Sequence, residues 1–398
     1  MNICFICRNI LRDRGGIETY TLELARALGA QGHMVHIIAQ NKGGLLRECT
    51  AKGLTIHPVD FVEHPFAGYW LMDRLVPIGD LRFSMAAAKK IRDLIHSIKI
   101  DIVEATDYFR VGFWYALDRK TPFLLRLHGW FFNRQEGRIN PLGSLNLRER
   151  LLLYMQQITI DRADAISIVS SDFANFASEI WKINSEKSRV ILNAVDVFKF
   201  TPDHVFPKDF SVLYVGRLVK NKGILTLADA ILNVLYYCPQ AKFVFAGKDM
   251  FLKEVGCMAR DYISKKAPTA SIVFLGEVSP DELVSEYRKS SVVVFPSFYE
   301  SSGIACLEAM SCGCAIVASD VGGFKDMIIN EEHGLLVPIG RPQELAQAIV
   351  RFFQDAALRK SCSQNAVQKV SKEFNYDKLV RNTLSVYEDT IAIYQASV

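Results

Sequence analysis

The sequence predicts an α/β protein made of two doubly wound, mostly parallel sheets. Short apolar runs, rich in β-branched and aromatic residues, alternate with segments of helical periodicity. This alternation is interrupted once, over residues 193–210, and then begins again. At 398 residues the chain is long for one domain, and with 50% hydrophobic residues it can fill two cores.

The first series of elements predicts the first sheet. "NICFIC" (residues 2–7) is expected to be a buried strand. After a Gly-Gly turn, Ile17, Tyr20, Leu24 and Leu28 recur at helical spacing. Further strands are predicted at residues 34–40, 101–106, 122–128 and 165–170. Strands that alternate with helices form parallel βαβ units.

The second series predicts a second sheet of the same kind. A helix is expected over residues 222–237, and Ser279, Pro280 and Glu282 form the cap of another. The last fifty residues show helical patterns without strands, so the final helix is expected to cross back to the first domain. Five strands are predicted at residues 211–216, 242–247, 271–276, 291–296 and 314–319.

The segment 193–210 is polar, contains Pro202 and Pro207, and lacks periodicity, which is typical of an inter-domain linker. The predicted domains are Rossmann-like halves that face a cleft. Their boundaries are residues 1–195 for the first domain, 196–210 for the linker, 211–380 for the second domain, and 381–398 for the returning helix.

Composition narrows the functional class. A formal charge of +4 is mild for this length, so no nucleic-acid partner is expected, although an anionic ligand or surface suits it. Nine cysteines, an odd number, indicate a reducing compartment. Cys4 and Cys7 form a CxxC without a second pair at zinc spacing, which favours strand packing over a metal site. With no secretory pattern and no apolar run long enough for a membrane span, a cytoplasmic location is expected.

Two glutamates, Glu300 and Glu308, stand on either side of a Ser-Ser-Gly turn in "ESSGIACLE". Beyond the strand and its loop, residues 301–304 are expected to start a helix that reaches about Cys312. Ser302, Gly303 and Ile304 would then present free backbone N–H groups, with the glycine permitting close approach, and form an anion cradle.

The spacing of the two carboxylates limits their chemistry. If the whole span were helical, they would be separated by a rise of about 12 Å. A glycosidase acid–base pair needs only ~5 to 9.5 Å. Each glutamate is therefore expected to bind hydroxyls on a different part of one extended ligand. The alternative is two surface glutamates near helix ends.

Other candidate residues follow predicted strands. Arg217 and Lys222 come just after the first strand of the second series, where parallel sheets bind ligands, and two cations on one loop can hold a diphosphate. The alternative is a solvated basic loop. Gly15 and Gly16 form a tight turn before the first helix, which a phosphate or sugar can approach. His128 ends a strand, where it could contact a sugar hydroxyl, take part in proton transfer, or serve a structural role.

Together these stretches resemble the retaining glycosyltransferases of family 4 (group 1), which have the GT-B architecture. The matching pieces occur in family order along nearly the whole chain: "GGIE", "LHG", "NAVDVFKFTP", "VGRLVKNKG", "FLGEVSPDEL" and "ESSGIACLEAMSCGCAIVASDVGG". The spacing E-S-x-G-x-x-x-x-E-A-M is the most specific of them.

The resemblance implies a nucleotide-diphosphate sugar held mainly by the second domain. Glu300 would hold hydroxyls of the donor sugar, Glu308 those of the ribose, and the amides near Gly303 the diphosphate. The roles implied for the remaining residues are neutralisation of the diphosphate by Arg217 and Lys222, a sugar contact from His128, and contact with donor phosphate or acceptor at the Gly15–Gly16 turn.

The implied activity is retaining transfer of a hexose-type sugar to a glycan, a lipid-linked acceptor or a small molecule, in cell-surface polysaccharide or glycoconjugate synthesis. No metal or other cofactor is expected, because Arg217 and Lys222 supply the positive charge and no DxD-like acidic cluster stands in the expected loop. A sugar-nucleotide isomerase (epimerase) on the same architecture is the alternative, and a non-catalytic binding module is a third. An NAD-dependent oxidoreductase is disfavoured because neither half contains GxGxxG followed by an acidic residue.

Two features bear on the acceptor. Trp130, Phe131 and Phe132 follow His128 and could line an acceptor pocket or pack a loop. Residues 82–99 form a basic amphipathic helix pattern, which favours packing over the sheet; docking on the inner face of an anionic membrane is the alternative.

Overall fold

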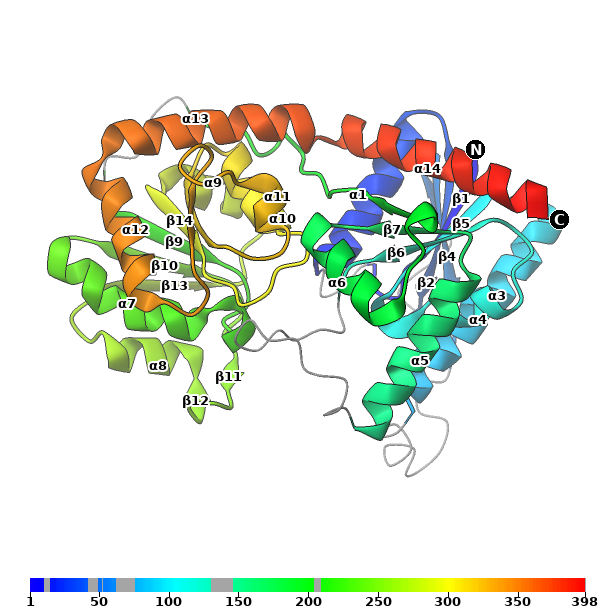
Figure 1. The fold of residues 1–398 in the computed structure, drawn as a ribbon, viewed down its shortest axis with the longest axis horizontal. Helices are drawn as coiled ribbons and strands as arrows, with labels where there is room; N and C mark the ends of the chain where they lie inside the picture. Colours follow the sequence, from blue (N-terminus) through cyan, green and yellow to red (C-terminus); the bar gives the residue numbers. More distant parts are fainter. Residues whose placement is uncertain are drawn as a thin grey trace. The chain divides into compact units, whose positions relative to one another are not determined.

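A computed structural model describes residues 1–10, 15–41, 49–51, 53–61, 76–129, 146–203 and 209–397. These residues divide into two compact units. Unit 1 comprises the described parts of 1–193 together with the C-terminal residues from Tyr376, and unit 2 comprises those of 194–375. Each unit contains its own mostly or wholly parallel sheet with helices packed on it, so the predicted fold class is confirmed (Figure 1).

The described strands of unit 1 form an eight-stranded sheet in the order β3-β4-β2-β1-β5-β6-β7-β8. Neighbouring strands are parallel except for the pair β3 and β4. The central strands are buried on both faces, which explains why they are continuous apolar runs. The strands are β1 (Asn2–Ile6), β2 (Met34–Gln40), β3 (Cys49–Ala51), β4 (Leu54–Val59), β5 (Ile102–Thr106), β6 (Phe123–Leu127), β7 (Ala165–Ile168) and β8 (Ser188–Val190).

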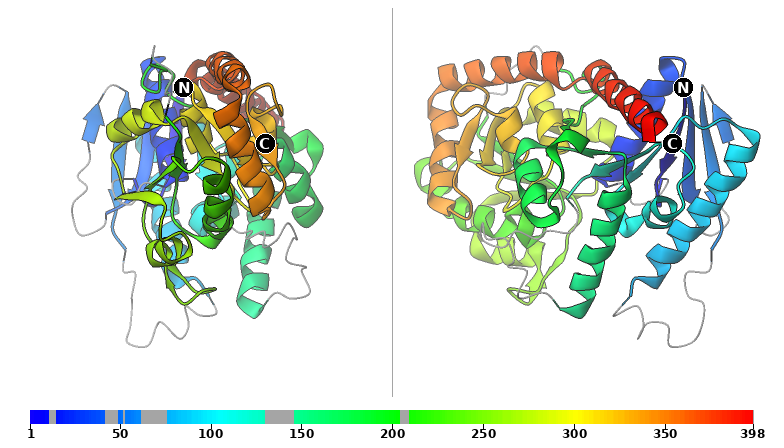
Figure 2. Two further views of the ribbon diagram at one scale, coloured as in Figure 1. Left: turned by 90° about the vertical axis from the view of Figure 1, so that its left-hand side faces the viewer. Right: turned by 45° about the vertical axis from the view of Figure 1, so that its right-hand side comes forward.

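Helices cover this sheet, and the last helix of the chain is one of them. α14 (Tyr376–Ser397) packs against α1 (Gly16–Ala30) and β6, and Figure 2 shows it beside the first elements of unit 1. The predicted return of the C-terminal helix is thereby confirmed. The other helical elements are α3 (Ile78–Ser97), η2 (Tyr108–Arg110), α4 (Phe113–Leu117), α5 (Leu147–Arg162), α6 (Ser171–Trp181) and η4 (Ser185–Lys187).

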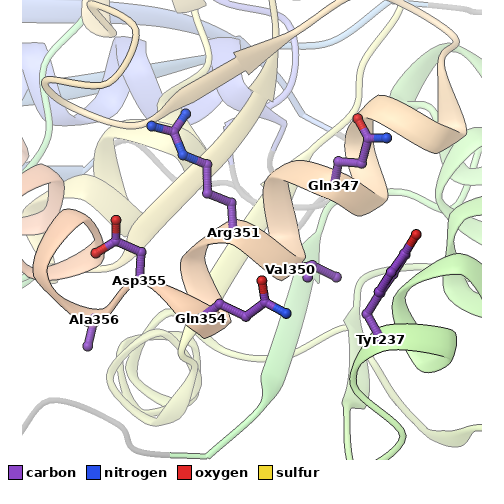
Figure 3. A pocket seen from close by; sticks show the side chains of 7 residues that line it. All are labelled: Tyr237, Gln347, Val350, Arg351, Gln354, Asp355 and Ala356. Carbon is purple, nitrogen blue, oxygen red and sulfur yellow. The ribbon is translucent and has the colours of Figure 1, made fainter.

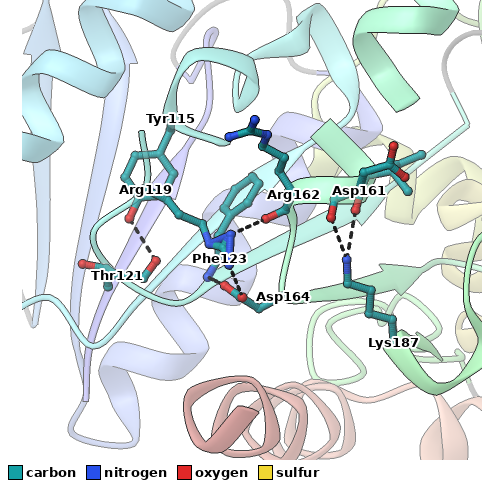
Figure 4. A network of polar contacts seen from close by, with 9 residues as sticks. Tyr115, Arg119, Thr121, Phe123, Asp161, Arg162, Asp164 and Lys187 are labelled. Atoms are coloured by element: carbon teal, nitrogen blue, oxygen red, sulfur yellow. Dashed lines mark hydrogen bonds and ion pairs between the residues drawn. The ribbon is translucent and has the colours of Figure 1, made fainter. Parts of the chain in front are cut away.

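A polar network fixes the amino ends of β6 and β7 (Figure 4). Asp164, just before β7, accepts hydrogen bonds from the backbone N–H of Phe123 at 2.9 Å and from Arg119 Nη2 at 2.7 Å. Arg119 also donates to the carbonyl of Arg162, at the end of α5. Burial raises the pKa of Asp164. The network is structural, because it lies at the opposite edge of the sheet from the carboxyl ends where ligands bind.

Unit 2 has a six-stranded sheet in the order β13-β10-β9-β14-β15-β16, and all its pairings are parallel. The strands are β9 (Ser211–Val215), β10 (Lys242–Ala246), β13 (Ser271–Gly276), β14 (Val292–Phe295), β15 (Ala315–Ser319) and β16 (Leu335–Val337). A separate antiparallel pair is formed by β11 (Phe251–Leu252) and β12 (Cys257–Met258).

Two layers of helices enclose this sheet. On one face α7 (Ile224–Tyr237), α8 (Ala259–Lys266) and α12 (Pro342–Gln354) bury their apolar sides in the core, and α7 and α8 run side by side in Figure 1. The other helical elements of unit 2 are η5 (Lys220–Lys222), α9 (Pro280–Lys289), α10 (Ile304–Ser311), α11 (Phe324–Met327) and α13 (Ala356–Glu373).

The helix pattern over residues 82–99 corresponds to α3, which begins four residues earlier than the pattern. Phe83, Ala87, Ile91 and Leu94 are buried, so the predicted packing of this helix is confirmed. Among the described residues, no helix is both long and apolar enough to cross a membrane.

Candidate functional site

The strand order of unit 2 brings two predicted site loops together. β9 and β14 are neighbours, and from this pair the chain winds outward in both directions, to β10 and β13 on one side and to β15 and β16 on the other. Loops after such a pair diverge, and ligands of doubly wound sheets bind there. Arg217 and Lys222 follow β9, whereas Glu300 follows β14.

Lys222 and Glu300 form an ion pair between the segments that follow β9 and β14. Lys222 Nζ lies 2.5 Å from Glu300 Oε2, and the two side chains are 28% and 16% exposed. The second oxygen, Oε1, accepts a hydrogen bond from the backbone N–H of Gly303 at 3.3 Å. The loops themselves are joined where Phe298 N donates to the carbonyl of Asn221 at 2.9 Å. The predicted lysine and glutamate therefore lie in one site, although they are 78 residues apart in the chain.

Arg217 lies near the same pair. Its carbonyl accepts a hydrogen bond from the buried hydroxyl of Tyr214 at 2.8 Å, while its side chain is exposed. Burial and then the carboxylate of Glu300 raise the pKa of Tyr214, and the charge of Arg217 lowers it. The charges of Glu300 and Arg217 therefore both act on the Tyr214 hydroxyl. Within the described residues the Arg217 guanidinium forms no ion pair, so it is available to an anion.

The start of α10 supplies the third component. Gly303 is its N-cap, with φ of 62°, and Ile304 is its first residue, preceded by Ser302 in the turn. The first N–H groups of a helix have no carbonyl partner within it, and their dipoles favour an anion. An added Cβ at Gly303 would lie 2.8 Å from side-chain atoms of Met327 and Phe324, so the position requires glycine.

The loop after β15, which contains Gly322 and Gly323, packs against the backbone of Glu300. The backbone N–H of Gly323 donates to the Glu300 carbonyl at 2.9 Å, and a Cβ on Gly322 would lie only 1.8 Å from that carbonyl oxygen. These glycines belong to the "DVGG" end of the family-like motif, but the sequence did not indicate that they contact Glu300. Tyr214 and Asn221 were also missed, because a single tyrosine or asparagine near a strand carries no distinctive pattern.

Glu308 lies on α10, one turn beyond Ile304. Its Oε2 is 3.2 Å from the hydroxyl of Tyr287. Burial raises the pKa of Glu308 to about 7. The 12 Å separation expected between Glu300 and Glu308 was based on a wrong assumption: Glu300 lies in the loop, and only the span from Ile304 onward is helical.

In unit 1, Gly15 is the N-cap of α1 and Gly16 its first residue. The backbone N–H of Gly15 donates to Glu18 Oε2 at 3.1 Å. Burial raises the pKa of this glutamate, which is only 7% exposed. One amide of the turn is therefore occupied by the protein itself.

His128 follows β6 and is 5% exposed. Asp107 fixes its backbone, because its two carboxylate oxygens accept from His128 N at 2.9 Å and Gly129 N at 3.0 Å. The imidazole packs edge-on against Tyr20, with 4.9 Å between ring centroids, and its Nε2 has no hydrogen-bond partner within the described residues. Trp130, Phe131 and Phe132 lie outside the described residues.

Burial, and then the positive charge of Arg126, lower the pKa of His128 to about 3. The ring is therefore neutral at physiological pH, with one nitrogen open for a hydrogen bond. This favours contact with a hydroxyl over proton transfer through an imidazolium.

Two family models together match most of the chain. The model for "Glycosyltransferase Family 4" matches residues 14–198, and the model for "Glycosyl transferases group 1" matches residues 198–369. The chain belongs to glycosyltransferase family 4. The two matches meet close to the division between the units, and residues Arg217 to Glu308 lie within the second match.

Individual relatives agree with the family assignment. The D-inositol 3-phosphate glycosyltransferase of Jonesia denitrificans is 26% identical over 95% of this chain and 92% of its own. The sucrose-phosphate synthase of Thermosynechococcus elongatus is 21% identical, covers 98% of this chain and 99% of its own, and superposes with a TM-score of 0.80. HepE of Anabaena, solved with UDP-glucose, is 19% identical, covers 100% of both chains and has a TM-score of 0.72. The chain is a glycosyltransferase with the GT-B fold.

A hollow of about 640 Å³ on unit 2 lies elsewhere. In Figure 3 the ring of Tyr237 stands at the end of α7, facing side chains of α12. The hollow is lined by Tyr237, Gln347, Val350, Arg351, Gln354, Asp355 and Ala356. None of these is a predicted site residue, so the candidate site is defined by the loops at the carboxyl ends of β9 and β14.

Proposed function

We propose that this glycosyltransferase is a retaining enzyme that moves a sugar from a nucleotide-diphosphate sugar to a glycan, a lipid-linked acceptor or a small molecule in cell-surface polysaccharide or glycoconjugate synthesis. The observation that carries the proposal is the Lys222–Glu300 pair beside the open end of α10. It combines a cation and backbone amides, which suit a diphosphate, with a carboxylate, which suits sugar hydroxyls.

In this proposal, Lys222 and Arg217 act on the leaving group. As the bond between the sugar C1 and the β-phosphate oxygen breaks, the electron pair moves to that oxygen, and the sugar becomes oxocarbenium-like. An ammonium, a guanidinium and the amide at Ile304 stabilise this added charge more than they stabilise the ground state; the Gly303 amide, which donates to Glu300 Oε1 in this structure, would have to change partner to join them. Because the protein supplies these charges, we propose that the reaction needs no metal.

Retention follows if the acceptor hydroxyl attacks C1 from the face that the diphosphate leaves. The new bond joins the acceptor oxygen to C1, and the acceptor proton passes to the departing β-phosphate oxygen. No separate general base is then needed. Glu300 would accept hydrogen bonds from donor-sugar hydroxyls, and the neutral His128 would bond another through Nε2.

A donor screen tests the proposal. Incubation with UDP-, GDP- and ADP-sugars should show slow release of one nucleoside diphosphate, and the same donor should raise the thermal midpoint. At 100 times its Kd a ligand stabilises the native state by about 2.7 kcal/mol. NMR of the transfer product should show the donor's anomeric configuration. An inverted product would refute retention, and a C2-epimerised donor would indicate the isomerase instead.

Donor affinity should depend on pH through Glu308. Burial raises the pKa of this carboxyl to about 7, so it becomes protonated as pH falls from 8 to 6. An ionised carboxylate accepts from both ribose hydroxyls, whereas the protonated form accepts less well. We expect the Kd of the preferred nucleotide sugar, measured by calorimetry, to rise about tenfold between pH 8 and pH 6. The Glu308→Gln variant should bind weakly and without this pH dependence; an equal pH dependence in both proteins would contradict the assignment.

A further inference from the structure

The motif "NAVDVFKFTP" has a structural role inside unit 2. Its residues 194–202 belong to unit 2 and are fixed to α9 and α10 by polar contacts. Ser311 Oγ donates to the carbonyl of Phe200 at 2.5 Å. Arg288 donates through Nε to the carbonyl of Thr201 at 2.8 Å and through Nη2 to its hydroxyl at 2.5 Å. This segment, which the sequence indicated as part of a linker, is thus packed on the two helices that carry Glu308 and Tyr287.

The contacts continue from this segment to the site. The ring of Phe200 lies 6.3 Å from that of Tyr287, measured between centroids, at an angle of 62°. Both are buried, Phe200 to 6% exposure and Tyr287 to zero. The Tyr287 hydroxyl lies 3.0 Å from the carbonyl oxygen of Ala305 and 3.2 Å from Glu308 Oε2. A side chain with no room to move therefore holds its hydroxyl between the first turn of α10 and the carboxylate.

We propose that Tyr287 is the positioning residue that orients the Glu308 carboxylate toward the ribose of the donor, and that Phe200 holds Tyr287 in place. This inference rests on the proposed function, because it takes Glu308 as the ribose-binding group. Tyr287 itself is enclosed and touches no substrate. It acts only through the carboxylate.

The chemistry of the hydroxyl supports this role. A tyrosine has one O–H to donate, and its oxygen can also accept. When Glu308 is ionised, Tyr287 donates to it. When Glu308 is protonated, it can donate to the Tyr287 oxygen, while Tyr287 donates to the Ala305 carbonyl. In both states one carboxyl oxygen is fixed, which leaves the other oriented for a ligand.

The groups around Glu308 act in opposite directions on its titration. Burial raises the pKa to about 7, while the hydrogen bond from Tyr287 and the charge of Lys199 lower it. Lys199 is in the same segment as Phe200 and pairs with Asp281 of α9 at 2.7 Å. Cys312, at the end of α10, also interacts electrostatically with Glu308. Removing the tyrosine hydroxyl removes one of the two influences that keep the carboxyl ionised.

The test compares ligands with and without ribose hydroxyls. The Kd of UDP, ADP and GDP, and of their 2′,3′-dideoxy analogues, is measured at pH 8 for the wild type and for Tyr287→Phe, which keeps the ring. The loss of an oriented hydrogen bond to a charged group predicts about tenfold weaker binding of the preferred ribonucleotide and a change below about twofold for its dideoxy analogue. Because loss of the Tyr287 hydrogen bond should raise the pKa of Glu308, the pH range over which the Kd changes should also move to higher pH.

Three further variants make the result decisive. Tyr237→Phe, at the exposed end of α7, is the matched control and should bind like the wild type. Phe200→Leu should also weaken binding of the ribonucleotide more than binding of its dideoxy analogue, but by less than Tyr287→Phe does. Glu308→Gln should also lose ribonucleotide binding and spare the dideoxy analogue. If Tyr287→Phe weakens both ligands equally, or neither, the positioning role is overturned while the proposed function survives. If Glu308→Gln fails to distinguish the two ligands, the ribose assignment fails, and the inference fails with it.

Discussion

Replacing Lys222 with alanine should lower kcat/KM for sugar transfer about 10²- to 10³-fold, the range observed when one preorganised charge-stabilising donor is removed. The change removes the ammonium that would face the developing phosphate charge. It also leaves Glu300, whose side chain is 16% exposed, without its 2.5 Å partner. Both effects act on the transition state, so kcat should fall more than KM rises.

The matched control is Lys220→Ala, two positions earlier in η5. It removes the same charge from the same turn, but Lys220 is not placed against Glu300, so activity should fall less than about threefold. Arg217→Ala should lower kcat/KM by an amount between those for Lys220→Ala and Lys222→Ala, because the exposed Arg217 guanidinium and Lys222 would act on the same diphosphate. Near-normal turnover of both Lys222→Ala and Arg217→Ala, with unchanged thermal midpoints, would rule out the phosphate role.

Much of the fold could be predicted because buried parallel strands are apolar runs. The segment 34–40 matches β2 at both ends, and the run 211–216 differs from β9 by one residue. β4 was not predicted; it contains Pro58, a residue that argues against a central strand. The structure tolerates this proline because β3 pairs only with Leu54 to Ile56, so Pro58 needs no N–H donor on that side.

The site was partly predictable for a different reason. Glu300, Arg217 and Lys222 lie in segments that follow the carboxyl ends of strands, and Glu308 lies one turn into the helix after the Glu300 loop. The chain sequence indicates these positions directly. The ion pair between Lys222 and Glu300 could not be derived from spacing, because it depends on β9 lying beside β14 in the sheet. Strand order is decided by tertiary packing. Tyr287 was missed for the same reason, since its role depends on α9 packing next to α10.

A second charged pair, buried inside the sheet of unit 1, gives the largest expected effect on stability. Glu104 and Arg126 interrupt the apolar strands β5 and β6, which are neighbours in the sheet. Arg126 Nε donates to Glu104 Oε1 at 2.8 Å, and the side chains are 0% and 1% exposed. Lone charges inside two apolar runs are a signal that could have revealed this pair from the sequence.

The C-terminal helix completes this buried network. The Tyr387 hydroxyl donates to Glu104 Oε2 at 2.6 Å, and Arg126 Nη2 reaches the Thr383 hydroxyl at 3.4 Å. The guanidinium carbon also lies 4.9 Å from the centre of the Tyr20 ring. The pair therefore joins β5, β6, α1 and α14 through groups that have no access to water.

Arg126→Met should destabilise unit 1 by about 3–5 kcal/mol, because it leaves the Glu104 carboxylate buried without its cation. The double variant Glu104→Gln with Arg126→Met should recover part of this loss, since no unpaired charge remains. The exposed pair of Arg92 and Asp118, with side chains 48% and 52% exposed, is the matched control, and Arg92→Met should cost less than about 1 kcal/mol. Thermal unfolding, with hydrogen exchange of α14 amides, measures all three. A cost for Arg126→Met no larger than that for Arg92→Met would show that the buried pair does not hold α14 to the sheet.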